Sequence, residues 1–405
     1  MKALGPIPAG FDADKDGRLL IGGRNAEALV AEAGGTPLFV YDSRRIAGQV
    51  ARFRAAFPSV ALHYAVKANP YGPLLEAMAT LVDGFDVASG GELGRVAHLG
   101  PPISFAGPGK REQELETAIR AGITINLESE GEAERALAIC ERDGLTARLA
   151  VRVNPPFGLK GSGQKMGGLA SPFGVDHDRV PALVRRIVEA GADWQGLHIF
   201  AGSQALHAEA LIELQRATVA LAAAICEEAG RAPPHVNLGG GFGIPYFAKD
   251  QPLDIEAVGA ALAKPLAERP KILFDTQFAI ELGRWLVGEA GIYLTRIIDR
   301  KVSRGKTFLV TDGGLQHQLA ASGNFGQLLR RNYPVAIANR FGIEPEEEAT
   351  VTGCLCTPLD LLADEALLPR AEVGDLVAIF CAGAYGLSAS PQEFLSQPRA
   401  REILV

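Results

Sequence analysis

The chain has 405 residues, of which 47% are hydrophobic, and its formal net charge is -7 at pH 7. This length and composition predict one large buried core and a second, smaller one. The acidic balance leaves no basic face for nucleic acid or for anionic lipid, and no apolar run is long enough for a signal peptide or a membrane span. We therefore expect a cytoplasmic protein that acts on small molecules.

The cysteines of the chain are few and scattered. There are five, at positions 140, 226, 354, 356 and 381. An odd number without paired C-x-x-C spacing predicts neither a disulfide framework nor a zinc site, and we expect no metal.

The first three quarters of the chain alternate between two patterns. Short apolar or β-branched runs that end in small or polar residues alternate with stretches rich in Ala, Leu, Glu and Arg. The apolar runs, in chain order, are VALHYAVKAN, VDGFDVASGGE, ISFAGPGK, ITINLESE, ARLAVRVNP, WQGLHIFAGSQ, HVNLGGGFG and FAIELGR. Such alternation predicts a (β/α)8 TIM-like barrel over residues 46–290, with a doubly wound open sheet as the alternative.

From residue 291 the pattern changes to strand candidates without regular helices. They include GIYLTRIIDRKVSRGKTFLVTD, EATVTGCLC and DLVAIFCAGAYG. We expect a C-terminal β-rich domain over 291–405. We also expect residues 1–45, which contain the strand candidate TPLFVYD, to join this domain.

The polar residues that close the apolar runs are the candidate site. Active sites of barrels lie at the carboxyl ends of the strands, so these side chains should converge. Any one of them alone would be explained as a solvated loop residue. The set is Lys67, Asp86, Arg152, His198, Ser203, Gly239, Gly240, Gly241, Glu281 and Arg284.

Two of these runs predict a phosphate site. NLGGGFG closes the seventh strand and ELGR the eighth, where barrels commonly bind phosphate through backbone N–H groups and an arginine. A tight turn would also explain the glycines if they stood alone. With Lys67 at the first strand end, the pattern predicts a phosphorylated aldehyde held as an imine, which fits pyridoxal phosphate. Glu281 would stand beside the pyridine nitrogen and favour its protonated form.

Ordered motifs along the chain carry a family resemblance. YAVKAN, FDVASGGE, RVNP, GSQ, GGGFG, ELGR, CTPLD and GAYG resemble, in this order, the fold type III pyridoxal-phosphate decarboxylases, the family of diaminopimelate and ornithine decarboxylases. The resemblance implies a barrel of the alanine racemase type. GPIPAGF, KMGG, HIFAGSQ and DRKVSRG are similar to the branch called exosortase-A-associated pyridoxal-dependent decarboxylases.

The resemblance implies roles for individual residues. Lys67 corresponds to the lysine that forms the Schiff base with the cofactor, Arg152 to a residue near the cofactor's phenolic oxygen, and Glu281 to the partner of the pyridine nitrogen. Asp86, His198, Phe200, Gly239, Gly240 and Gly283 would also bind the cofactor, and the phosphate contacts would be Ser203, Gly241, Arg284 and Tyr385.

The resemblance further implies a head-to-tail homodimer. The CTPLD segment of one subunit would reach the partner's site, where Cys356 would return a proton to the substrate after carbon dioxide leaves. Asp360 would contact the substrate from the same segment.

The chain also departs from the family pattern. Phe200 replaces a histidine that stacks on the cofactor ring, which keeps an aromatic face and loses a proton carrier. Thr357 stands where the family commonly has an acidic residue that pairs with a distal ammonium, so a basic amino acid is not the expected substrate.

The remaining substrate candidates lie within the predicted β-rich domain. They are His317, Asn324 and Arg331, in the glycine-rich stretch TDGGLQHQLAASGNFGQLLRRNYP. The loop over 158–174 is a mobile lid or a solvent loop. We expect a decarboxylase of an amino acid or of an aminoacyl group linked to a carrier protein. A racemase and a non-catalytic cofactor-binding protein are the alternatives.

Overall fold

The computed structural model describes residues 1–159, 164–165, 167–327 and 329–405. Its contacts divide the chain into a barrel unit, Val50–Gly243 with Pro252–Gly283, and a sheet unit, Met1–Gln49 with Ile244–Gln251 and Arg284–Val405. The barrel unit thus begins later than residue 46 and ends before residue 290, because the segment after the eighth strand makes its contacts within the sheet unit. Residues 160–163 and 166 of the predicted lid lie outside the described residues.

The barrel unit is a closed ring of eight parallel strands, so the predicted barrel is confirmed and the open sheet is not. Pairing of the first strand with the last and of the fourth with the fifth completes the ring. The strands are β4 (Ala61–Ala65), β5 (Gly84–Val87), β6 (Ile103–Phe105), β7 (Thr124–Leu127), β8 (Arg148–Asn154), β11 (Asp193–Ile199), β13 (His235–Asn237) and β14 (Gln277–Leu282). β10 (Val175–Asp176) adds to β8, and β9 (Gln164–Lys165) pairs with β12 (Gly202–Ser203).

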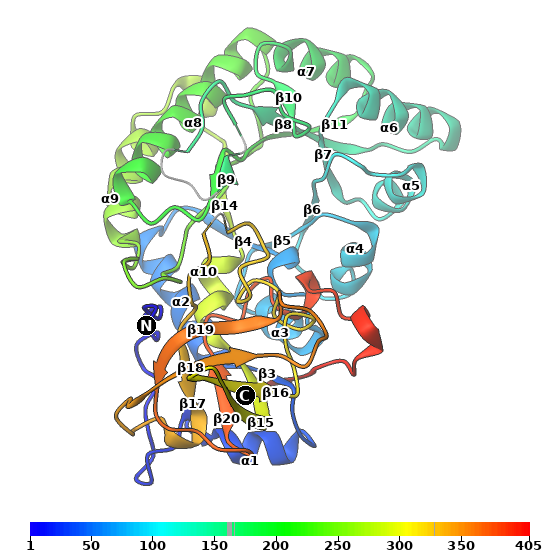
Figure 1. Ribbon diagram of the computed structural model, residues 1–405. Helices are drawn as coiled ribbons and strands as arrows, with labels where there is room; N and C mark the ends of the chain where they lie inside the picture. The colour runs from blue at the N-terminus through cyan, green and yellow to red at the C-terminus, as the bar shows by residue number, and fades with distance from the viewer. Residues whose placement is uncertain (160–163, 166, 328) are drawn as a thin grey trace. The chain divides into compact units, whose positions relative to one another are not determined.

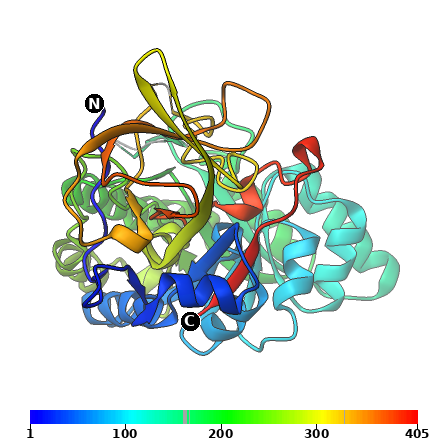
Figure 2. The ribbon, with the colours of Figure 1, turned by 60° about the horizontal axis from the view of Figure 1, so that its bottom comes forward.

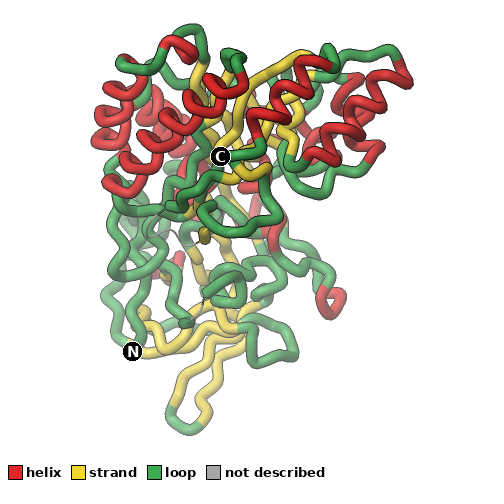
Figure 3. The backbone as a smooth tube through the Cα atoms, turned by 90° about the horizontal axis from the view of Figure 1, so that it is seen from above, coloured by secondary structure: helices red, strands yellow, loops and turns green. Residues whose placement is uncertain are grey.

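Helices lie outside this ring of strands, as Figure 3 shows. They are α2 (Ser43–Ala56), α3 (Gly72–Ala79), α4 (Gly90–Val96), α5 (Glu112–Arg120), α6 (Glu130–Asp143), α7 (Val180–Glu189), α8 (Ala208–Ala229) and α9 (Ile255–Ala267). Local sequence sets their ends: Ser89, Ser129 and Asp254 accept a backbone N–H at the first turn, and Gly144 and Gly230 end helices in the left-handed conformation. No helix in the described part of the chain is long and apolar enough to cross a membrane.

The sheet unit is built on one long strand, β15 (Gly291–Ser303), whose first half pairs with β3 (Leu38–Tyr41) on one side and β20 (Leu376–Ile379) on the other. Its second half pairs with β16 (Lys306–Thr311). β17 (Val335–Ile337), β18 (Glu347–Thr352), β19 (Leu361–Leu368) and β21 (Arg401–Leu404) extend the sheet. Near the chain start lie β1 (Leu20–Ile21), β2 (Arg24–Asn25) and α1 (Ala26–Glu32), and α10 (Arg284–Val287) precedes β15.

Both ends of the chain take part in the sheet unit. β3 pairs in parallel with β21, and Figure 2 shows these blue and red strands side by side. Leu38 and Val40 of β3 are buried with Ile292 and Leu294 of β15 in one hydrophobic core. Residues far apart in sequence therefore share this core, and the N-terminal strand is part of it.

Two helical glycines allow a matched test of packing. In α9, a Cβ on Gly259 would overlap the carbonyl oxygen of Ala56 in α2, whereas a Cβ on Gly48 meets nothing within 4 Å. We expect Gly259→Ala to lower the free energy of unfolding by about 1–3 kcal/mol because the two helices must separate. Gly48→Ala should raise it by about 0.5–1 kcal/mol. Urea unfolding of both variants measures this, and equal effects would contradict the helix contact.

Candidate active site

The candidate lysine lies directly after the first barrel strand. β4 ends at Ala65, and Lys67 occupies a single 3-10 turn over Val66–Ala68. The Tyr64 hydroxyl donates to the Asn69 carbonyl at 3.0 Å and so fixes the turn. Nζ of Lys67 lies 5.5 Å from the centroid of the Phe200 ring, which follows β11. The structure therefore brings an exposed primary amine and a buried aromatic face together.

Glu281 is a buried carboxylate held by two neighbouring strands. It is 6% exposed, and its Oε2 lies 2.9 Å from Nε2 of His198 and accepts a hydrogen bond from Asn237 Nδ2 at 3.2 Å. Burial raises its pKa, but the charges of His198, Lys67 and Arg152 outweigh burial and lower it. Glu281 is thus ionised at neutral pH and can stabilise a cationic ring nitrogen.

Arg152 is also paired inside the barrel. Its Nη1 donates to Oε1 of Glu128 at 2.7 Å, and both side chains are buried. The same Oε1 accepts the backbone N–H of Gly107 at 2.6 Å, and Oε2 accepts that of Gly174 at 2.8 Å. The Arg152 guanidinium therefore stands in a fixed position at the end of β8.

Asp86, at the end of β5, faces a histidine. Its Oδ2 lies 3.5 Å from Nδ1 of His63, and β4 and β5 pair so that Asp86 lies opposite Ala65. Burial lowers the pKa of His63, but Asp86 and Glu281 outweigh burial and raise it. Asp86 and His63 thus lie close together near the strand end that carries Lys67.

Glycines allow the strand ends of the barrel to approach one another. A Cβ on Gly240 would overlap the Glu281 carbonyl oxygen, and Gly239 and Gly241 have φ of +72° and +82°. A Cβ on Gly283 would come within 2.6 Å of the Ala68 Cβ. The Gly239 N–H donates to Asn237 Oδ1 at 2.9 Å, while Gly240 and Gly241 carry no side chain that would screen a phosphate, and Ser203 of β12 lies near the same loop.

The predicted phosphate contacts Arg284 and Tyr385 lie in the sheet unit. Nη1 of Arg284 donates to the Tyr246 hydroxyl at 2.9 Å, and its Cζ lies 4.7 Å from the centroid of the Tyr385 ring. Among the described residues no carboxylate pairs with Arg284, and its Nε has no hydrogen-bond partner. This guanidinium keeps donors available for an anion.

The CTPLD segment forms the loop between β18 and β19. Cys356 is exposed at this loop. Asp360, predicted to contact substrate, is instead 3% exposed and accepts the backbone N–H groups of Leu315 at 2.7 Å and Leu355 at 2.8 Å. The Asp360 carboxylate therefore holds the loop, and its contact with substrate stays a prediction. Thr357 Oγ1 accepts the N–H of Leu359 at 3.3 Å.

The other substrate candidates have different surroundings. His317 is 1% exposed, with Nδ1 3.1 Å from the Tyr293 hydroxyl and Nε2 2.8 Å from the Pro398 carbonyl oxygen. Both ring nitrogens of His317 are thus bound inside the sheet unit, and its substrate role stays a prediction. Asn324 donates to the Leu359 carbonyl at 3.2 Å, and Arg331 is exposed.

The barrel residues fit pyridoxal phosphate. Lys67 offers the amine for its aldehyde, Phe200 a face for its ring, Glu281 an anion for its pyridine nitrogen, and the glycine loop donors for its phosphate. Glu128 and Asn237 were not among the predicted site residues, although both close apolar runs, ITINLE and HVN, as Lys67 does.

Comparison with known proteins agrees with this site. A family model described as the pyridoxal-binding domain of pyridoxal-dependent decarboxylases matches residues 43–288. The chain is 36% identical to the L-glutamyl-[BtrI acyl-carrier protein] decarboxylase of Niallia circulans, over 91% of this chain and 88% of that protein. It is 33% identical to the diaminopimelate decarboxylase of Archaeoglobus fulgidus, over 96% and 92%.

A solved structure has the same fold. The diaminopimelate decarboxylase from M. jannaschii in complex with L-lysine superposes with a TM-score of 0.87 at 27% identity, covering 98% of this chain and 93% of that one. The predicted decarboxylase resemblance and the cofactor are thereby confirmed, and decarboxylation is favoured over racemisation and over non-catalytic binding. The exosortase-associated branch stays a prediction.

Lys67 can be tested as the cofactor lysine. We expect the purified protein to be yellow and Lys67→Ala to lose this absorption, because the amine beside Phe200 is the attachment point for the aldehyde. Borohydride reduction followed by peptide mapping should place the pyridoxyl group on Lys67. Recovery of the group on Lys110, a buried lysine of the same barrel, would refute the assignment.

Proposed function

We propose a substrate class for this chain, which belongs to the pyridoxal-dependent decarboxylases and is a pyridoxal-phosphate-dependent carboxy-lyase. The substrate is an amino acid linked through its side chain to a carrier protein, with its α-amino and α-carboxyl groups free. Decarboxylation requires both of these groups, so the side-chain carboxyl of an acidic amino acid is the natural point of attachment.

The neutral Thr357 beside Cys356 carries this proposal. A distal ammonium would need a carboxylate in the CTPLD loop, and Thr357 supplies only a hydroxyl. Asp360, the one carboxylate of that loop, is bound to two backbone N–H groups and is not free to replace it. A missing charge-assisted hydrogen bond costs about 1.5–3 kcal/mol, or about one to two decades in specificity.

The relatives support a carrier-linked substrate but include a second possibility. One relative with 36% identity is named for a glutamyl group on an acyl-carrier protein, and others at 32–33% are named for diaminopimelate. Diaminopimelate carries a distal ammonium, for which the CTPLD loop of this chain offers no free carboxylate. The loop chemistry therefore favours the first substrate class.

The roles of the residues follow from their surroundings. When bound, the cofactor supplies an electron sink for the negative charge left at the α-carbon as carbon dioxide departs. Lys67 holds the cofactor through its aldehyde, and Glu281, ionised because its pKa is lowered, keeps the ring nitrogen protonated. Phe200, whose ring lies beside the Lys67 amine, would pack on the cofactor ring. Ser203 and the glycines of the barrel unit would bind the phosphate, Arg284 and Tyr385 are further predicted phosphate contacts, and Cys356 would return a proton to the α-carbon.

Cys356 acts in the site of a second subunit. Its thiol is exposed, and Leu359 in the same loop is 56% exposed, so the loop presents an acid and an apolar side chain for contact with another surface. A two-fold homodimer would use both copies of this loop. We place the reaction in the cytoplasm, where thiols such as Cys356 stay reduced.

The substrate proposal predicts a specificity difference that one residue controls. Wild type should release carbon dioxide from a carrier-linked L-glutamyl group and turn over ornithine, lysine and meso-diaminopimelate poorly. Thr357→Glu should raise kcat/KM for the basic amino acids by about one to two decades, since it supplies the missing charge. Thr357→Gln is the uncharged control. Efficient use of meso-diaminopimelate by wild type would refute the proposal.

The dimer proposal predicts complementation between two inactive proteins. Lys67→Ala and Cys356→Ala should each be inactive, and mixing them should restore activity through heterodimers with one intact site. Activity measured after verified subunit exchange tests this, and light scattering gives the oligomeric state. A monomer at assay concentration, or no recovered activity, would refute the shared site.

A further inference from the structure

Arg331 is an exposed cation on an aromatic surface. Its Cζ lies 3.6 Å from the centroid of the Phe247 ring, which belongs to a cluster with Tyr246 and Tyr333. Tyr246 and Phe247 lie 4.7 and 5.8 Å, centroid to centroid, from Tyr333. The ring thus supports the flat face of the guanidinium and fixes its position.

The donors of this guanidinium remain available for a ligand. Among the described residues no carboxylate lies within ion-pair distance of Arg331, whose backbone N–H donates to Gln327 Oε1 at 2.9 Å. Stacking uses the π face and leaves the in-plane N–H groups at the edge. That edge matches an anion with two accessible oxygens, such as a phosphate or carboxylate.

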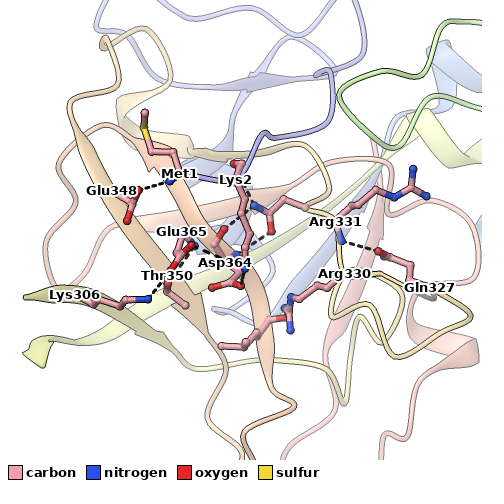
Figure 4. A network of polar contacts seen from close by, with 12 residues as sticks. Met1, Lys2, Lys306, Gln327, Arg330, Arg331, Glu348, Thr350, Asp364 and Glu365 are labelled. Atoms are coloured by element: carbon pink, nitrogen blue, oxygen red, sulfur yellow. Dashed lines mark hydrogen bonds and ion pairs between the residues drawn. The ribbon is translucent and has the colours of Figure 1, made fainter. Parts of the chain in front are cut away.

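The segment that carries Arg331 is attached to the loop that carries Cys356. The neighbouring Arg330 donates to the Leu361 carbonyl oxygen, and Asn324 donates to that of Leu359 at 3.2 Å. Figure 4 shows Arg330 and Arg331 leaving the backbone in different directions, so the first anchors the segment and the second is not part of that anchor. On the same aromatic cluster, Tyr246 also binds Arg284.

We propose that Arg331 binds the phosphodiester of the phosphopantetheine arm that presents the substrate, an inference that rests on the proposed carrier-linked function. Glu281, the predicted partner of the ring nitrogen, is buried, whereas Arg331 is exposed. In a tethered substrate the phosphodiester is the anion furthest from the reacting carbon, so an exposed cation suits it. A free amino acid would have no group for this position.

Two substrates that differ only in the phosphate test the inference. They are L-glutamyl thioesters, linked through the side-chain carboxyl, of phosphopantetheine and of pantetheine. For Arg331→Ala we expect KM for the phosphorylated thioester to rise by about tenfold or more, with kcat nearly unchanged, and no change for the pantetheine thioester. Arg331→Lys should recover part of the loss. Arg216→Ala, which removes an exposed charge from α8, is the control and should match wild type on both substrates.

The outcomes separate this inference from the proposed function. Cofactor absorbance and circular dichroism of each variant verify folding, and Arg331→Lys provides a second variant if Arg331→Ala is unstable. An equal loss on both thioesters would mean that Arg331 contacts the aminoacyl group or only supports the fold, and would overturn the inference alone. If wild type decarboxylates free amino acids but neither thioester, the proposed function and this inference both fail.

Discussion

The buried charge of Glu281 is the constraint on which the barrel site depends. A carboxylate in a protein interior is costly unless cations and hydrogen-bond donors compensate it. Here the compensation comes from neighbouring strands, through His198 on β11 and Asn237 on β13. Their side chains reach Glu281 only if β11, β13 and β14 keep the observed register, in which His198 lies opposite Asn237 and Asn237 opposite Ala279. The electrostatics of the site and the closure of the barrel therefore require the same alignment.

The close packing of glycines at the strand ends also depends on the position of Glu281. Gly240 lies where any side chain would overlap the carbonyl oxygen of Glu281 itself. The loop that offers N–H groups to a phosphate is thus packed directly against the strand that carries the carboxylate. Groups that are distant in sequence but adjacent in the barrel would therefore hold the two ends of the cofactor.

In the sheet unit a buried carboxylate is compensated by backbone groups and not by side chains. Asp360 is also a buried carboxylate, but it is compensated by the backbone N–H groups of Leu315 and Leu355. Burial raises its pKa despite these bonds. Its carboxylate stabilises the loop that exposes Cys356. The CTPLD loop thus has no free negative charge among the described residues, and the proposed choice of substrate rests on that.

The sequence by itself determined the order of the elements and the chemistry at the strand ends. Eight apolar runs predicted the eight barrel strands, and the YAVKAN, GGGFG and ELGR motifs predicted a pyridoxal phosphate decarboxylase. The tertiary structure decided which polar groups are bound within the protein and which remain available to a ligand. Asp360 and His317 are bound within the protein, Glu128 fixes Arg152, and Arg331 stands exposed on Phe247. Spacing along a chain gives the strand and the face on which a residue lies, whereas the partner of a polar atom depends on residues distant in sequence that only folding brings within hydrogen-bond distance.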